Sequence, residues 1–163
     1  MAFIVEDGTG VTDANSYQTV DAFREYWSDR GVTFTVLDSK IESWLILSTD
    51  YADENNSFIG YQVDTDQSLE WPRYNAKDKK GKLWDSDVLP KWLLYGINEL
   101  ASLLKNEPTL EPDITASSTG VTSKRVGPFS TNFGSNAALR QEPLYRKAMK
   151  YFRIITDNSV VVL

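Results

Sequence analysis

The sequence contains no cysteine and no histidine. Without them the chain cannot form disulfides, has no thiolate nucleophile and lacks the usual ligands of structural zinc. It also lacks the side chain that most often transfers protons near neutral pH. Catalysis by carboxylates or by a serine–lysine pair is not excluded. The absences nevertheless weigh against an enzyme, and we expect no cofactor and no metal site.

Long hydrophobic runs are also missing. The longest are Trp44–Leu47, Trp92–Tyr95 and Val160–Leu163, which are far too short to cross a membrane. The opening segment Met1–Asp7 has no basic residue before an apolar stretch, so we expect no secretory signal and no membrane partner. Hydrophobic residues make up 41% of the 163, which is enough for the core of one globular domain.

Charge is distributed unevenly along a chain whose net charge is −6. The first seventy residues carry 14 acidic and 3 basic side chains, whereas the remainder carries 9 acidic and 14 basic ones. Such a chain can attract copies of itself head to tail, with the acidic part of one copy against the basic part of the next, or can present its basic part to nucleic acid. The alternative is an unevenly charged, solvated surface.

Hydrophobic spacing and capping residues predict three core helices. The first runs from Thr19, whose hydroxyl can cap free amides, until Gly31 stops it. The second is capped by Asp38 or Ser39, and Ser39–Glu42 matches a capping box. The third has Pro90 in its first turn and buries one apolar stripe. That stripe consists of Leu93, Ile97, Leu100, Ala101 and Leu104.

Residues 54–87 show no sustained helical period. A stretch of this length without secondary structure is uncommon in a compact domain unless it packs as an ordered loop. We expect Trp71, Pro72 and Arg73 to anchor it structurally. The lysines near its tip are candidate DNA contacts: Lys77, Lys79, Lys80 and Lys82.

Five tryptophans and eight tyrosines raise the possibility of stacking on the bases of a single strand. Trp27, Trp44 and Trp92 lie in or beside apolar helical stripes and are interpreted as core residues. Trp71 and Trp84 have basic neighbours and could stack on bases, although packing of the loop onto the helices is the favoured interpretation.

The C-terminal part differs in character. Residues 108–120 have the composition of a linker. Val121–Phe133 alternates like a strand or a hairpin, with a bend at Gly127–Pro128. Glu142–Ile155 can form a basic helix, and an apolar β-type run, Val160–Leu163, follows it.

The predicted fold is therefore mainly α: a small helical bundle with a long ordered loop and an extended C-terminal arm containing short β-strands. Its expected divisions are a core domain with an N-terminal arm over 1–107, a linker over 108–120 and a docking arm over 121–163. Either the terminal run pairs with 121–133 within one subunit, or the arm docks on a partner. The candidate docking residues are Arg146, Lys147, Lys150, Arg153, Val160, Val161, Val162 and Leu163.

Segments spread over nearly the whole chain resemble a known group of phage proteins. They are Phe3–Tyr17, Asp29–Gly31, Lys40–Asp53, Ile59–Gly60, Gln67–Arg73, Leu89–Pro90, Asn98–Ala101 and Lys124–Phe129. The group is labelled as DnaT-like single-stranded DNA-binding proteins of bacteriophages. In layout it is similar to head–tail connector proteins, also called adaptor or head-completion proteins. This chain departs from the pattern at its end, where Tyr145–Phe152 is polar and basic.

The resemblance implies a non-enzymatic structural protein of the virion neck, made in the host cytoplasm. It implies a ring, dodecameric in expectation, that binds the portal protein and a tail or tail-completion protein. Such a ring continues the DNA channel and can touch genomic DNA. The label itself implies strand binding, so a single-stranded DNA-binding module is the alternative function.

Overall fold

The computed structural model describes residues 2–78, 80–106, 110, 123–126, 129–132 and 145–157. In these residues the chain forms four helices, α1 Val20–Ser28, α2 Asp38–Asn55, α3 Lys91–Leu103 and α4 Arg146–Phe152. Its strands are β1 Tyr61–Gln62, β2 Arg73–Tyr74, β3 Ser123–Val126 and β4 Phe129–Asn132. No helix within the described part of the chain is long and apolar enough to span a membrane.

The chain divides into two compact units. One comprises Met1–Leu110 together with Lys147–Leu163, and the other comprises Glu111–Arg146. This differs from the expected division, which placed everything after residue 120 in one arm. The reason is that α4 packs against α3, so the helix returns to the first unit.

The start of α1 agrees with the sequence prediction. Thr19 Oγ1 accepts a hydrogen bond from Ala22 N at 3.1 Å, and this satisfies one of the amides left free at a helix start. Gly31 has φ 73°, the left-handed conformation expected of the residue that stops the helix.

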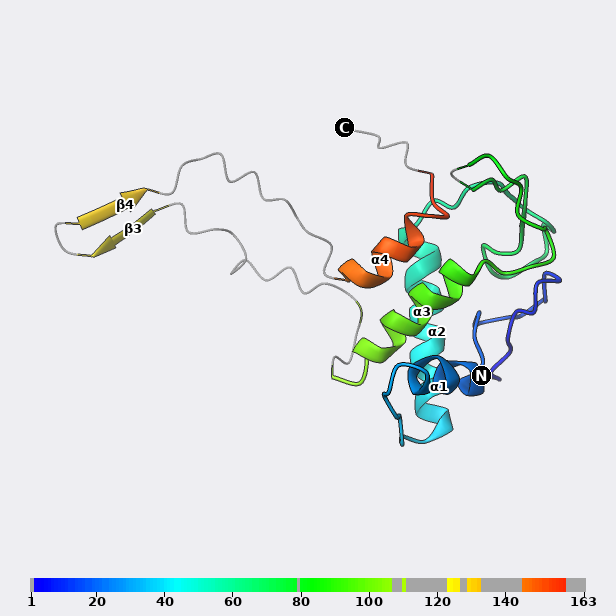
Figure 1. Cartoon of the computed structure of the whole chain (residues 1–163), viewed down its shortest axis with the longest axis horizontal. Coiled ribbons are helices and arrows are strands. Elements are labelled where there is room, and N and C mark those ends of the chain that lie inside the picture. The colour runs from blue at the N-terminus through cyan, green and yellow to red at the C-terminus, as the bar shows by residue number, and fades with distance from the viewer. Residues whose placement is uncertain are drawn as a thin grey trace. The chain divides into compact units, whose positions relative to one another are not determined.

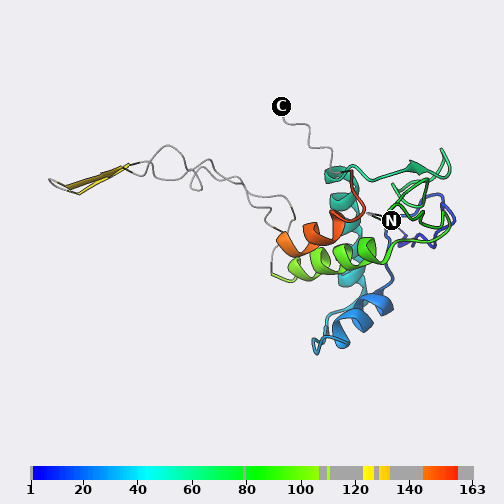
Figure 2. The same ribbon diagram turned by 45° about the horizontal axis from the view of Figure 1, so that its top comes forward.

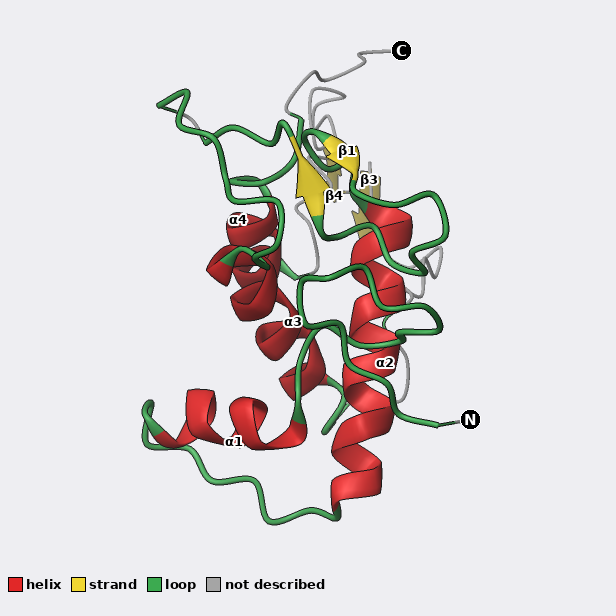
Figure 3. Cartoon of the chain, turned by 90° about the vertical axis from the view of Figure 1, so that its right-hand side faces the viewer, coloured by secondary structure: helices red, strands yellow, loops and turns green. Residues whose placement is uncertain are grey.

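The predicted capping box at the start of α2 is wrong. The helix begins at Asp38 after Leu37, and no side chain caps it. Ser39 therefore lies within the first turn. The Asp38 carboxylate is used elsewhere, in an ion pair with Arg24 Nη2 at 2.6 Å that ties the start of α2 to α1. Figure 3 shows α1 near the N-terminal end of α2 and β1 near its C-terminal end.

The predicted core stripe of α3 is confirmed. Leu93, Ile97, Leu100 and Ala101 are fully buried, and Leu104 is buried just after the last turn. Pro90 caps the helix from outside rather than sitting in its first turn.

Helix α4 lies beside α3 (Figure 1), and a second view shows the same pairing (Figure 2). Gly96 makes this close approach possible, because a Cβ at this position would collide with the Phe152 ring. Phe152, at the end of α4, and Ile155, just after it, are fully buried. These contacts make α4 part of the core rather than part of a docking arm.

The long segment between α2 and α3 is irregular, and its ordered packing agrees with expectation. It contains the two-residue antiparallel ribbon β1–β2, in which Tyr61 pairs with Tyr74 and Gln62 with Arg73. Buried Gln67 replaces much of the missing secondary structure. Its Oε1 accepts from Val63 N and Asp64 N, each at 3.0 Å, and its Nε2 donates to two carbonyls, those of Leu69 and Pro72.

The second unit contains the hairpin β3–β4, in which Ser123 pairs with Asn132 and Val126 with Phe129. Of the two predictions for 121–133, a strand or a hairpin, the structure shows the hairpin. Three predicted features lie outside the residues that the structure describes. They are the bend at Gly127–Pro128, the linker except for Leu110, and the run Val160–Leu163.

Candidate nucleic-acid interface

Three half-buried aromatic rings meet where α3 and α4 pack together. Trp92 and Tyr151 are stacked, with centroids 6.0 Å apart and planes 19° apart. Tyr95 lies edge-on to both, 6.0 Å from Trp92 and 5.6 Å from Tyr151. Each ring keeps part of its surface accessible to solvent.

The cluster continues onto α1. The Tyr95 ring lies 5.1 Å from the ring of Tyr26, which in turn lies 5.3 Å from Trp27. Tyr26 is buried, whereas Trp27 is only half-buried. Aromatic side chains from three helices thus form one connected group.

Three cationic side chains lie over these rings. The Arg30 guanidinium carbon is 3.4 Å from the Tyr26 centroid and 5.5 Å from that of Tyr95. Lys91 Nζ is 4.5 Å from the Trp92 centroid. Lys147 Nζ is 5.7 Å from the Trp27 centroid. We call Trp27, Arg30, Lys91, Trp92, Tyr95, Lys147 and Tyr151 the helical aromatic face.

A buried carboxylate holds the three helices of this face together. Glu99 Oε1 accepts a hydrogen bond from the Tyr26 hydroxyl at 2.7 Å and pairs with Lys147 Nζ at 2.6 Å. Burial and the bond to Glu99 raise the pKa of the Tyr26 hydroxyl well above its ordinary value, so this hydroxyl stays protonated. Because Lys147 compensates the charge of Glu99, the carboxylate does not make the face acidic.

The basic residues predicted for docking join this surface in part. Arg146, Lys147, Lys150 and Arg153 are all exposed on α4 or just after it. Lys147 belongs to the helical aromatic face through its contacts with Glu99 and Trp27.

The sequence-predicted loop anchor is built around Trp71, which is fully buried. The backbone N–H of Trp71 donates to the Tyr17 hydroxyl at 3.0 Å, and the indole ring packs edge-on against Phe58. The bond to Pro72 is cis. The Arg73 guanidinium donates to the carbonyl groups of Ile59 and Gly60. In this structure the Trp71 ring has no accessible surface on which a base could stack.

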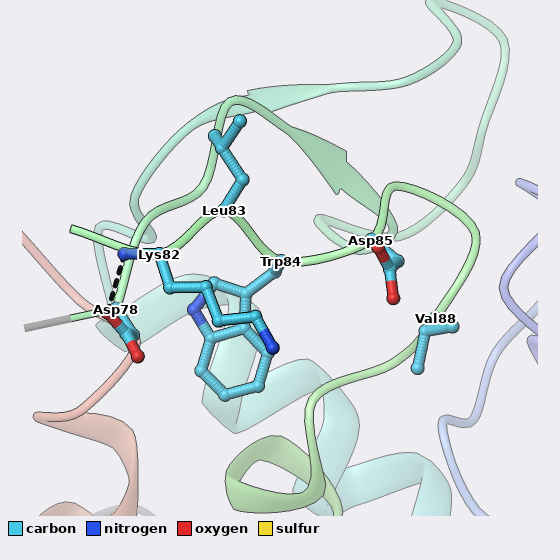
Figure 4. A pocket seen from close by; sticks show the side chains of 6 residues that line it. All are labelled: Asp78, Lys82, Leu83, Trp84, Asp85 and Val88. Atoms are coloured by element: carbon cyan, nitrogen blue, oxygen red, sulfur yellow. Dashed lines mark hydrogen bonds between the residues drawn. The ribbon is translucent and has the colours of Figure 1, made fainter. Parts of the chain in front are cut away.

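The lysine-rich tip has a different character. Lys77, Lys80 and Lys82 are exposed, and Lys79 lies outside the described residues. Half-buried Trp84 lies in a small pocket with Lys82 (Figure 4). Two carboxylates, Asp78 and Asp85, line the same pocket. They would repel a phosphate, so this pocket is a poorer nucleic-acid site than the helical aromatic face.

Two of the tryptophans interpreted from the sequence as core residues, Trp27 and Trp92, are only half-buried. The sequence gives no prediction that Tyr95 and Arg30 lie beside them. A helical signal was present, because Trp92 and Tyr95 lie three residues apart and outside the Leu93 stripe. Arg30 follows Tyr26 by one turn, the spacing at which side chains on a helix meet.

The acidic side chains of the chain do not gather into a metal site in the described residues. Within the described ranges, no cluster of three or more Asp, Glu, His or Cys side chains has suitable geometry. The carboxylate of Asp53 instead accepts a hydrogen bond from the Tyr17 hydroxyl at 2.8 Å and another from Glu70 N at 3.1 Å.

Fold and site together define a small, mostly helical protein with a cationic aromatic surface. Residues 1–162 match the family model described as "Putative DnaT-like ssDNA binding protein", and the chain belongs to this family. Neither the curated proteins nor the solved structures contain a significant match.

The family match corrects the connector interpretation. The description of the family points to single-stranded DNA, and it gives no support to a head–tail connector. It likewise gives no support to the ring, the portal contact or the tail contact that the resemblance implied. The alternative drawn from the same resemblance, strand binding, is the one that the match favours.

Proposed function

We propose that this protein binds single-stranded DNA through the helical aromatic face. Family membership supports the ligand class, and the geometry supports the location. The observation that carries the proposal is the set of half-exposed rings Trp92, Tyr95 and Tyr151, with Lys91 and Arg30 directly over the cluster.

The chemistry of this face fits a single strand better than a duplex. Unpaired bases expose their flat surfaces, and a base stacked on an aromatic side chain contributes about 1–3 kcal/mol without regard to sequence. The cations beside the rings can neutralise the phosphates between stacked bases. A duplex hides its base faces, so it would meet only the cations.

The proposal assigns two kinds of work to different residues. Tyr151 and Trp92 offer stacking surface. Lys91, over the Trp92 ring, and Lys150, an exposed lysine of α4 next to Tyr151 in sequence, offer charge. Neither lysine takes part in the Glu99 ion pair, so both can be removed without leaving that buried carboxylate unpaired. The two contributions are therefore separable by mutation.

Binding should be measured by fluorescence anisotropy with a labelled oligothymidine over a salt series. The wild type should bind it more tightly than a duplex of equal length, with affinity falling as salt rises. The double variant Lys91→Ala/Lys150→Ala should reduce the salt slope by about 1.4, since each phosphate contact on a single strand contributes about 0.7. Lys40→Ala, an exposed lysine of α2 outside the face, should leave the slope unchanged.

Stacking is tested by Tyr151→Leu, which keeps an apolar side chain against α3 but removes the ring. We expect a loss of affinity of roughly 1–3 kcal/mol with little change in the salt slope. A variant that melts like the wild type and binds DNA equally well would show that these rings serve packing alone. No DNA binding by the wild type would refute the proposed function itself.

A further inference from the structure

A second aromatic pair lies away from the helical aromatic face, on the ribbon β1–β2. Tyr61 is 63% exposed and Tyr74 45% exposed, although their rings are in contact, with centroids 5.5 Å apart and planes 35° apart. Adjacent exposed apolar side chains mark interaction surfaces more often than single ones do.

The ribbon is held rigidly from its other side. Arg73 Nε donates to the Ile59 carbonyl at 3.0 Å, Arg73 Nη2 donates to the Gly60 carbonyl at 2.8 Å, and the same guanidinium pairs with Glu70. Gly60 has φ 79°, and a Cβ there would collide with the Tyr74 carbonyl. The tyrosine pair is therefore positioned in advance, which lowers the entropic cost of binding to it.

A lysine-bearing hairpin continues directly from this ribbon. Lys77 and Leu83 form an antiparallel bridge, and Asp78 N donates to the Lys82 carbonyl at 2.8 Å. The Asp78 carboxylate accepts from Lys80 N and Lys82 N and so shapes the turn. It keeps its charge, so a phosphate would pass the exposed lysine side chains and not the pocket that Asp78 and Asp85 line. The lysine side chains themselves are exposed.

The ribbon is also connected to the helical aromatic face through the backbone. Ile59 N donates to the Ile155 carbonyl at 3.1 Å, and Phe58 bridges Thr156. Tyr151 lies about one helical turn before Ile155, and Tyr61 follows Ile59 by two residues of extended chain. The two aromatic surfaces therefore belong to one compact unit, and these backbone contacts join the segments that carry them.

We propose that Tyr61 and Tyr74 form a second stacking platform for the same DNA strand, with its phosphates passing Lys77, Lys80 and Lys82. This inference rests on the proposed function and extends its footprint beyond the helices. An exposed apolar pair could instead dock a protein. The adjoining lysines favour a polyanion, and the exposed acidic residues Asp64 and Asp66 lie at the opposite end of β1, so the strand would leave the ribbon on the lysine side.

The test uses labelled oligothymidines of about 6 and about 20 nucleotides, short enough for one site and long enough for both. The double variant Tyr61→Ser/Tyr74→Ser should bind the short strand like the wild type and the long strand about tenfold or more weakly. Val63→Ser, at an exposed apolar position just after β1, should bind both like the wild type. Melting temperatures establish that each variant is folded.

The lysines give an independent measurement. Lys77→Ala/Lys80→Ala/Lys82→Ala should reduce the salt slope for the long strand by about 2 and leave the slope for the short strand unchanged. Ultraviolet crosslinking of wild-type protein to a long strand containing 5-iododeoxyuridine should attach DNA to peptides that contain Tyr61 or Tyr74.

The outcomes separate the two proposals. Unchanged long-strand affinity in the folded double tyrosine variant, or crosslinks confined to the helices, overturns the second platform while the helical aromatic face stands. Equal loss from Val63→Ser also overturns it, because the effect would then not depend on rings. Failure of the wild type to bind either strand rejects both proposals.

Discussion

The helices and the long loop between α2 and α3 achieve order in different ways. In α3 a repeated apolar stripe buries Leu93, Ile97 and Leu100 against the rest of the core, and the backbone satisfies its own hydrogen bonds. The loop has no such repeated spacing of apolar residues. Order there comes from individual side chains such as Gln67 and Arg73, which bind backbone groups that no secondary structure would satisfy.

This difference predicts different responses to mutation. A helix distributes its stability over many similar contacts, so a single change is partly absorbed by its neighbours. The loop concentrates its stability in a few side chains whose removal leaves buried polar groups or a cavity. The mutations below test this contrast.

The largest effect should come from Trp71→Ala in the loop. The ring is fully buried against Phe58, and truncating a buried tryptophan costs about 3–5 kcal/mol. Chemical denaturation should show this loss as a lower midpoint. Trp84→Ala, at a half-buried position of the same loop, should cost clearly less. If both variants have the same denaturation midpoint, the stability of the loop does not depend mainly on Trp71.

A smaller effect is expected from Gly96→Ala in α3. Helix propensity alone would make alanine more stable than glycine by about 1 kcal/mol. The added methyl group would however strike the Phe152 ring, and overpacking of this kind costs about 1–3 kcal/mol. We therefore expect net destabilisation, measured by thermal melting.

The double variant Gly96→Ala/Phe152→Leu provides the control for this explanation. Because leucine is smaller than phenylalanine, the second change makes room for the methyl group. The combined loss should then be less than the sum of the two single losses. A stabilised Gly96→Ala protein would show that propensity outweighs packing at this contact.

The helices were predictable from sequence because their signals are local and repeated. Thr19, Gly31 and the α3 stripe each follow from spacing within a few residues. The capping box at Ser39 is wrong because α2 begins one residue earlier, at Asp38, which leaves Ser39 inside the first turn. The ion pair of Asp38 with Arg24 joins two helices, and sequence spacing does not show such a partner.

The membership of α4 in the core could not be predicted for a related reason. Its docking depends on Gly96, which in sequence is only a weak point in a helix. The residues of the candidate site can likewise be found in the sequence only one segment at a time. Trp92 and Lys147 belong to separate segments, and it is the packing of α3 against α4 that brings them onto one surface.

Asp53 connects helix α2 to the long loop, and changing it should have the smallest effect on stability. This residue of α2 binds Tyr17 and the loop amide of Glu70, and Asp50 lies on the same helix. Burial raises the pKa of its carboxyl to about 7, although the hydrogen bonds from Glu70 N–H and the Tyr17 hydroxyl oppose that shift. The folded protein therefore keeps this proton at pH values where the unfolded chain, with a pKa near 3.8, has lost it.

Because the folded state then binds more protons, this group lowers the free energy of unfolding as pH rises from about 4 to about 7. The decrease should be on the order of 1 kcal/mol per pH unit and should level off above pH 7. Asp53→Asn removes the titrating group, so urea denaturation over this range should show a flatter profile than in the wild type. Asp7→Asn serves as the control, because a hydrogen bond from Thr9 lowers the pKa of Asp7 and places its titration below this range. Parallel profiles for wild type and Asp53→Asn would contradict a neutral Asp53 at the junction of helix and loop. If the free energy of unfolding falls more steeply with pH in the wild type than in Asp53→Asn, the contact between α2 and the loop is most stable while the Asp53 carboxyl is protonated.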